Sequence, residues 1–215
     1  MLNIENFIAK YVTKRPESMF QADLHTHQPA LIKAIEGKSV LVIGGAGSIG
    51  SSYIKALLPF KPKGLVVVDI SENGLTELTR ELRSTSAFTV PTDYVTYPMN
   101  YADDTFVKMF KARDGFDIVA NFSAHKHVRS EKDKYSVEAL LKNNVVNAKK
   151  FLDLLCDYPP EHFFCVSTDK AANPVNIMGG SKKIMEDMIM AYAHKFPVTT
   201  ARFANVAFSN GSLPA

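Results

Sequence analysis

From residue 38 onward, short runs of apolar and β-branched residues alternate with stretches in which apolar side chains recur every three or four positions. The short runs are typical of buried strands, and the recurring positions are typical of amphipathic helices. The six expected strands lie at residues 39–43, 64–69, 93–97, 116–122, 162–167 and 198–203. The expected helices lie near residues 49–58, 75–82, 106–110, 136–155 and 181–194.

Strands that are apolar along their whole length and alternate with helices predict an α/β fold, with a parallel sheet covered by helices on both faces. Because crossovers between parallel strands are right-handed, the expected architecture is a doubly wound sheet of the Rossmann type. We expect this domain to occupy residues 38–215. Residues 1–37 stand apart as an N-terminal extension with no strong hydrophobic period.

The N-terminal extension contains His25 and His27, which together raise the question of a metal site. A structural metal centre usually needs four ligands, and no third ligand is apparent nearby in the sequence. We therefore expect a surface segment here, either solvated or packed, and no metal.

Composition and charge narrow the function classes. The 46% apolar and 22% charged residues are ordinary for a globular chain and exclude collagen-like, coiled-coil and disordered proteins. A net charge of +3 without a basic run gives no sign of a nucleic-acid partner. Cys156 and Cys165 lack metal-binding spacing, so we expect two inert buried thiols in a reducing compartment.

Without an 18-residue apolar run or a signal-peptide layout, we expect a cytoplasmic protein with no membrane span.

The loop after the first expected strand is the strongest functional signal. It reads Gly44-Gly45-Ala46-Gly47-Ser48-Ile49-Gly50, directly before a helix. Glycines there let the backbone approach a pyrophosphate, and the helix N-terminus supplies N–H donors. Asp69 ends the second strand about 20 residues beyond the loop, where an acid accepts ribose hydroxyls. Since a carboxylate repels a 2′-phosphate, we predict NAD rather than NADP. The alternatives are a tight turn without a ligand and an Asp69 that only caps the next turn.

Polar clusters follow three later strands at the end of the sheet where ligands bind in such folds. These clusters lie at residues 121–127, 167–170 together with 178–182, and 205–212. Their convergence predicts an active site. The alternative is that Thr168 and Asp169 cap a helix, that Lys170 is solvated, and that Met178 belongs to the core.

These motifs resemble the extended short-chain dehydrogenase/reductases, and among them the nucleotide-sugar 4,6-dehydratases of polysaccharide biosynthesis. The resemblance covers roughly residues 37–214. It is carried by the segments 37–50, 123–128, 167–182, 202–206 and 211–212, and by Asn144. The most specific stretch is Ser-Thr-Asp-Lys-Ala-Ala-Asn-Pro-Val-Asn-Ile-Met-Gly-Gly-Ser-Lys at 167–182. Met178 stands where the wider family has the tyrosine of Tyr-x-x-x-Lys, as in a subgroup that converts UDP-N-acetylglucosamine to 4-keto-6-deoxy sugars.

The resemblance implies a mechanism in which C4 of the sugar is oxidised, water leaves across C5 and C6, and hydride returns to C6. Asp169 and Lys170 take the places of the acid at the C6 hydroxyl and the base at C5. Thr168 would lie near O4, and Lys182 would hold the nicotinamide ribose. Met178 cannot take a proton, so C4 oxidation must use Thr168, Asp169 or a relayed water.

The resemblance also implies binding residues. Those expected at the cofactor are Gly44, Gly47, Ser48, Ile49, Gly50, Asp69, Ser71, Asn100, Tyr101, Ser123, Ala124, Lys126, Asn144 and Lys182. Those expected at the substrate are Lys126, His127 and Asn205, with His125 and His127 as hydrogen-bonded supports rather than catalysts. Three positions depart from the family pattern, namely Asn100, Ala204 and Asn210.

Family members extend well past the sixth strand into a small domain that grips the nucleotide. We therefore expect this chain to be truncated and to be inactive alone. We also expect the protein to be a homo-oligomer. Two alternatives remain, a nucleotide-sugar 4-epimerase and a non-catalytic NAD-binding module. The missing tyrosine counts against the epimerase.

Overall fold

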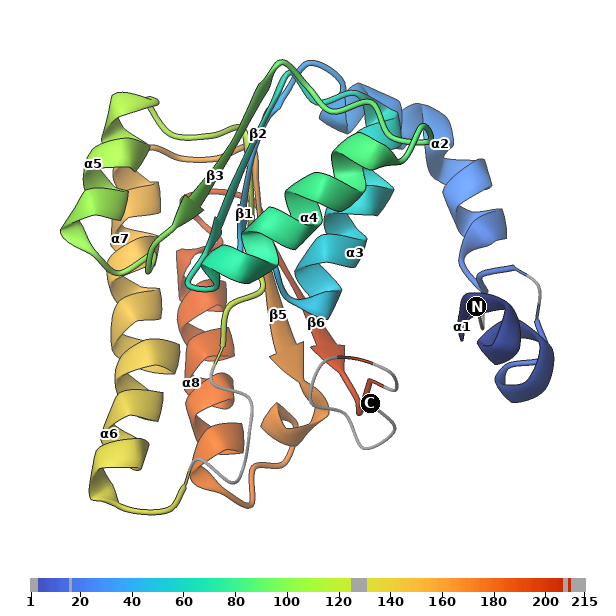
Figure 1. The fold of residues 1–215 in the computed structure, drawn as a ribbon. Helices are drawn as coiled ribbons and strands as arrows, with labels where there is room; N and C mark the ends of the chain where they lie inside the picture. Colours follow the sequence, from blue (N-terminus) through green and yellow to red (C-terminus); the bar gives the residue numbers. More distant parts are fainter. Residues whose placement is uncertain (1–3, 16, 125–130, 207–208, 210–215) are drawn as a thin grey trace.

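The computed structural model describes residues 4–15, 17–124, 131–206 and 209, and its centre is one six-stranded parallel sheet (Figure 1). The strand order is β3-β2-β1-β4-β5-β6, the doubly wound order with its switch point between β1 and β4. This confirms the expected Rossmann-type fold. The strands are β1 (Ser39–Ile43), β2 (Gly64–Asp69), β3 (Asp93–Pro98), β4 (Ile118–Asn121), β5 (His162–Thr168) and β6 (Val198–Phe203).

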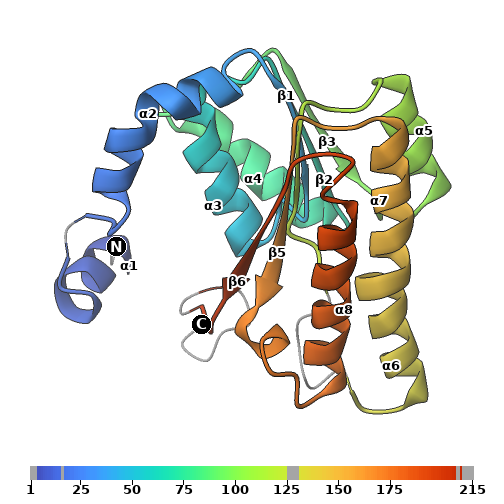
Figure 2. The ribbon, with the colours of Figure 1, turned by 180° about the vertical axis from the view of Figure 1, so that it is seen from behind.

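Helices cover both faces of the sheet, and each layer buries its own apolar core (Figures 1 and 2). Along β1, Val40 and Val42 point into one core while Leu41 and Ile43 point into the other, which explains the uninterrupted apolar run. The helices of the first layer are α3 (Ser48–Leu57) and α4 (Glu72–Ser84). Those of the second are α5 (Asp104–Ala112), α7 (Ala148–Asp157) and α8 (Ile177–Tyr192).

Several element boundaries differ from the sequence-based expectation. The fourth strand spans four residues, not 116–122, and the fifth extends to Thr168. The long helix begins earlier than expected, as α6 (Lys134–Leu141), and passes through the π-helical segment η4 (Lys142–Asn147) before α7. The last helix starts at Ile177 rather than residue 181, so Met178 lies in a helix and not in a loop. The 3₁₀ turns η2 (Leu58–Phe60) and η5 (Asp169–Ala171) complete this part of the fold.

The N-terminal extension is helical although its sequence shows no strong period. It comprises α1 (Ile4–Phe7), the π-helical η1 (Ile8–Val12) and α2 (Gln21–Ile35), and it projects away from the sheet (Figures 1 and 2). No residue of α2 is buried. His25 and His27 are both exposed on α2, two positions apart, so their side chains do not face each other. In the described ranges, no group of three or more His, Cys, Asp or Glu residues could hold a metal ion.

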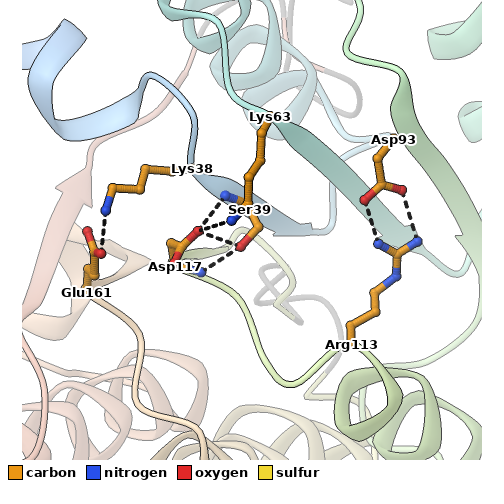
Figure 3. Close-up of polar contacts among 7 residues, drawn as sticks. All are labelled: Lys38, Ser39, Lys63, Asp93, Arg113, Asp117 and Glu161. Atoms are coloured by element: carbon orange, nitrogen blue, oxygen red, sulfur yellow. Dashed lines mark hydrogen bonds and ion pairs between the residues drawn. The ribbon is translucent and has the colours of Figure 1, made fainter.

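Ion pairs and hydrogen bonds tie the strands together at the end of the sheet where they begin (Figure 3). Asp117 accepts hydrogen bonds from the backbone N–H of Ser39 at 2.7 Å and from its hydroxyl at 2.8 Å. Burial acts to raise the pKa of Asp117, but these bonds and the Lys63 cation outweigh it, so the net shift is downward. This network lies opposite the loops where ligands bind in such sheets. The two other ion pairs drawn are Lys38–Glu161 and Arg113–Asp93.

The two cysteines differ in burial. Cys165 lies in the core with 1% of its surface exposed, as expected. Cys156 is half-buried near the end of α7, so the expectation of two buried thiols is wrong for this residue. Both thiols are free, and burial raises the pKa of each. Among the described helices, none is both long enough and apolar enough to cross a membrane.

Candidate active site

The glycine loop between β1 and α3 is shaped by close backbone contacts. Gly44 has a φ of +76°, and a Cβ there would lie 2.7 Å from the backbone nitrogen of Ser123. At Gly50, a Cβ would lie 2.3 Å from the carbonyl oxygen of Gly44. These two glycines are therefore required by the fold itself, because they let the loop pass β4 and let α3 pack against the loop.

Gly47 differs from its neighbours, since the protein does not crowd it. A Cβ there would meet only the carbonyl oxygen of Gly44, at an ordinary 3.5 Å, and φ is −72°. Gly47 is also the N-cap of α3, and it offers no side chain to the N–H groups of the first turn. Ser48 and Ile49 form that turn. The positive end of the helix is thus left accessible to an anion.

Asp69 ends β2 beside the glycine loop. One of its carboxylate oxygens accepts from the backbone N–H of Ala46 at 3.0 Å, and the other accepts from that of Ser71 at 2.9 Å. The carboxylate therefore caps the next turn, as the alternative interpretation held, and it also tethers the loop. Each oxygen has two lone pairs, so each can accept one further hydrogen bond, such as that of a ribose hydroxyl. Ser71 in turn caps α4, with its hydroxyl accepting from the N–H of Gly74 at 3.2 Å.

The remaining predicted cofactor residues lie after β3 and β4. Asn100 is half-buried and accepts from the backbone N–H of Ala102 at 2.9 Å. Ser123 donates its hydroxyl to Asn121 at 2.8 Å, and Ala124 is half-buried beside it. Tyr101 is only 6% exposed, and its ring lies within the apolar core.

Thr168, Asp169 and Lys170 form one hydrogen-bonded turn at the carboxyl end of β5. The Thr168 hydroxyl donates to Asp169 Oδ1 at 2.9 Å, and Lys170 Nζ lies 3.4 Å from the same oxygen. The Thr168 hydroxyl bond, followed by those from Lys170, lowers the pKa of Asp169. Lys170 Nζ also lies 3.4 Å from the side-chain oxygen of Asn205, which follows β6. The expected convergence of the loops after β5 and β6 is therefore observed.

The first two turns of α8 carry Met178 and Lys182, one above the other. Met178 is 2% exposed and Lys182 is 3% exposed. The Lys182 ammonium donates to the carbonyl oxygen of Val166 at 2.9 Å and lies 3.5 Å from Met185 Sδ. Burial lowers the pKa of Lys182. One carbonyl and one weak sulfur acceptor do not exhaust the three donors of an ammonium group.

Asn144 joins the π-helical segment to α8. Its side-chain amide donates to the hydroxyl of Ser181 at 3.1 Å, and that hydroxyl donates to the carbonyl of Met178 at 2.7 Å. The Tyr101 hydroxyl donates to the carbonyl of Asn143 at 3.0 Å, within the same segment. π-Helical turns are rare and occur frequently at functional sites. This one is hydrogen-bonded both to Tyr101, which follows β3, and to Ser181 of α8.

Two acids near α8 were not singled out by the sequence. Glu131 accepts from the backbone N–H of Met178 at 2.7 Å. Glu186, 5% exposed, pairs with Arg202 of β6 at 2.6 Å. The partners are 47 and 16 residues apart in the chain, so no local sequence pattern predicts either contact. His125, Lys126 and His127, which were predicted at the site, lie outside the described residues, as does Asn210.

Comparison with known proteins agrees with the fold. A sequence model described as "Polysaccharide biosynthesis protein" matches residues 40–214. An uncharacterised membrane protein of Methanocaldococcus jannaschii is 37% identical over 181 residues, covering 82% of this chain and 51% of that protein. The UDP-N-acetylglucosamine 4,6-dehydratase (inverting) of Campylobacter jejuni serotype O:23/36 is 29% identical over 185 residues, covering 82% and 52%. The chain thus spans about half the length of these curated relatives.

More distant relatives and solved structures widen the comparison. UDP-glucose 4-epimerases of Rickettsia species are 27–28% identical, covering 82% of this chain and 51% of each enzyme. The crystal structure of Pen from Bacillus thuringiensis superposes with a TM-score of 0.72 at 26% identity, covering 83% of this chain and 53% of that one. The chain therefore belongs to the polysaccharide biosynthesis protein family, a branch of the extended short-chain dehydrogenase/reductases.

Proposed function

We propose that the protein is an NAD-dependent nucleotide-sugar 4,6-dehydratase that acts on UDP-N-acetylglucosamine in polysaccharide biosynthesis. The observation that carries this proposal is the contact between Asp169 and Lys170 at the carboxyl end of β5. An elimination across C5 and C6 needs a base and an acid side by side, and these two side chains supply that pair. The relative from Campylobacter jejuni, named as a dehydratase of this substrate, supports the proposed sugar.

The cofactor side of the site has the features that NAD requires. The uncrowded Gly47 and the N-terminus of α3 fit a pyrophosphate, and Asp69 fits the adenosine ribose. The remaining donor capacity of Lys182 fits the hydroxyls of the nicotinamide ribose. When bound, NAD would accept the hydride from C4 of the sugar and return it to C6.

The protonation of Asp169 follows from its contacts. In the free protein its lowered pKa keeps it a carboxylate, which cannot act as an acid. The Thr168 hydroxyl donates to that carboxylate, so a proton leaving the C4 hydroxyl can enter Thr168 while Thr168 passes its own proton to Asp169. Asp169 then holds the proton that the departing C6 hydroxyl needs. This relay replaces the missing tyrosine, because the thioether of Met178 carries no proton.

Lys170 is the proposed base at C5. Its Nζ lies 3.4 Å from Asp169 Oδ1 and 3.4 Å from the side-chain oxygen of Asn205, so it stands beside the proposed acid at the C6 hydroxyl. In the elimination the Lys170 nitrogen takes the C5 proton while Asp169 gives its proton to the C6 oxygen, which leaves as water.

A 4-epimerase is the second candidate, because enzymes named UDP-glucose 4-epimerase are among the relatives. Against it stands Met178, since a 4-epimerase of this fold uses the tyrosine that is absent here. A non-catalytic NAD-binding module is the third. Incubating the whole natural protein with NAD and UDP-N-acetylglucosamine separates the three. We expect a UDP-4-keto-6-deoxy sugar, whereas a 4-epimer or NAD binding without turnover would favour the other two.

A further inference from the structure

The N-terminus of α8 is held by two side chains from different parts of the chain. Asn176 is its N-cap and accepts from the backbone N–H of Gly179 at 2.7 Å. Glu131 accepts from the N–H of Met178, also at 2.7 Å, although it lies 47 residues earlier. The first N–H groups of a helix have no partner within the helix. Glu131 supplies a charged acceptor to one of them, where a negative charge also favours the helix dipole.

The turn that Glu131 holds lies directly against the Asp169–Lys170 pair. At Gly179, the residue after Met178, an added Cβ would lie 2.7 Å from the carbonyl oxygen of Lys170. The backbone of α8 therefore touches the backbone of η5 without an intervening side chain. A shift of the first turn of α8 moves the surface on which Lys170 rests. Because this contact is between backbones, no rotamer change can absorb the shift.

We propose that Glu131 is a positioning residue for the reaction, acting through Met178 and Gly179 on the Asp169–Lys170 pair. The expected effect on kcat rests on the proposed function, but the expected effect on the structure does not. The hydrogen bond of Glu131 goes to the backbone of Met178 and not to Thr168, Asp169 or Lys170. Its role is to keep η5 and the start of α8 in one arrangement, because catalytic geometry is sensitive to displacements of about 1 Å.

The test compares Glu131→Ala with Glu131→Gln and with Asp133→Ala in the whole natural protein. Glu131→Gln keeps an acceptor oxygen, so its amide exchange and its kcat should be close to those of the wild-type protein. Asp133 is a matched control, because it is an exposed acid two residues away that caps α6 through the N–H groups of Tyr135 and Ser136. Its removal takes away a comparable cap without touching α8.

Two readouts decide the proposal. By hydrogen exchange, Glu131→Ala should speed amide exchange in peptides covering 168–172 and 176–182 by roughly 3- to 30-fold, the range expected for a lost cap. Asp133→Ala should instead affect the start of α6. By kinetics, Glu131→Ala should lower kcat about tenfold with little change in KM or in the NAD dissociation constant. Asp133→Ala should leave kcat unchanged.

The outcomes separate this proposal from the proposed function. If the wild-type protein turns over no UDP-N-acetylglucosamine, the proposed function fails, and the exchange pattern still decides whether Glu131 holds the two turns. The positioning role is overturned if Glu131→Ala leaves exchange at 168–172 unchanged. It is also overturned, for an active enzyme, if Glu131→Ala and Asp133→Ala lower kcat equally, because that result indicates general destabilisation.

Discussion

The carboxylate of Asp69 accepts a hydrogen bond from the backbone N–H of Ala46, so the acid at the end of β2 holds the loop at the end of β1. Asp69 is the last residue of β2, and Ala46 lies in the loop after the neighbouring strand β1, beside the switch point between β1 and β4. The same side chain thus sets the position of the glycine loop and keeps lone pairs for a further hydrogen-bond donor. Changes at Asp69 should therefore affect both halves of a dinucleotide site.

Replacing Asp69 by alanine should weaken NAD binding and narrow the preference for NAD over NADP. The variant loses both the ribose acceptor and the charge that repels a 2′-phosphate. We expect NAD affinity to fall about 10- to 100-fold, the worth of one or two hydrogen bonds to a charged group. Titration with both cofactors measures the effect, with Glu72→Gln as a control for a nearby exposed acid. Equal binding of both cofactors by the wild-type protein would contradict the assignment.

Gly47→Ala and Gly50→Ala should separate binding from folding. At Gly47 the backbone suits alanine and the Cβ meets no close atom, so the main cost is a poorer N-cap, and the free energy of unfolding should fall by no more than about 1 kcal/mol. NAD affinity should nevertheless fall at least about tenfold, because the Cβ occupies space needed by the pyrophosphate. At Gly50 the clash with Gly44 should cost roughly 1–3 kcal/mol of stability. Unchanged NAD binding by Gly47→Ala would argue against a phosphate at α3.

Tyr101→Phe should lower stability without changing NAD affinity. The hydroxyl is buried and donates to the carbonyl of Asn143, so its loss leaves that carbonyl without this partner. We expect a loss of roughly 1–2 kcal/mol in the free energy of unfolding. Burial also raises the pKa of Tyr101, as expected for a core hydroxyl. A substantial loss of NAD affinity would instead place the Tyr101 side chain at the cofactor, as the family resemblance implied.

Glu186→Gln should lower the free energy of unfolding near neutral pH. It should also make that free energy less dependent on pH in the acidic range. The Arg202 hydrogen bonds lower the pKa of Glu186 below the ordinary value of 4.5. A lowered folded-state pKa adds stability above the unfolded value, and this contribution is lost as pH falls through the folded value. Denaturant unfolding at pH 7 should show a deficit of about 1–3 kcal/mol that shrinks below pH 4. Glu77→Gln, which breaks an exposed pair with Arg80, should change little at either pH.

The sheet and its glycine loop were predictable because their signals are local. Apolar runs identify the strands, and the right-handed crossover rule favours a doubly wound sheet. The start of α8 was missed because Met178-Gly179-Gly180 reads as a loop, since glycine is a poor helix former. Tertiary contacts override that tendency, with Glu131 and Asn176 capping the helix and the backbone of η5 packing against it.

Two further features were beyond the sequence for similar reasons. The π-helical segment around Asn144 has no signature in hydrophobic spacing, because one extra residue in a turn leaves the apolar pattern of a long helix nearly unchanged. The helix α2 buries no residue, so no apolar stripe announced it. Conversely, the sequence motif identified Thr168, Asp169 and Lys170 as candidates. Their hydrogen bonds to one another are visible only in the structure.

Turnover of UDP-N-acetylglucosamine in deuterated water tests the central claim most directly, when the wild-type protein is compared with Lys170→Ala. The dehydratase mechanism predicts a 4-keto-6-deoxy product that carries solvent deuterium at C5, read by mass spectrometry and NMR. Lys170→Ala should still allow C4 oxidation, seen as NADH absorbance, while water loss falls by roughly 10²–10⁴-fold. A product without solvent deuterium, or unchanged turnover by Lys170→Ala, would contradict the account.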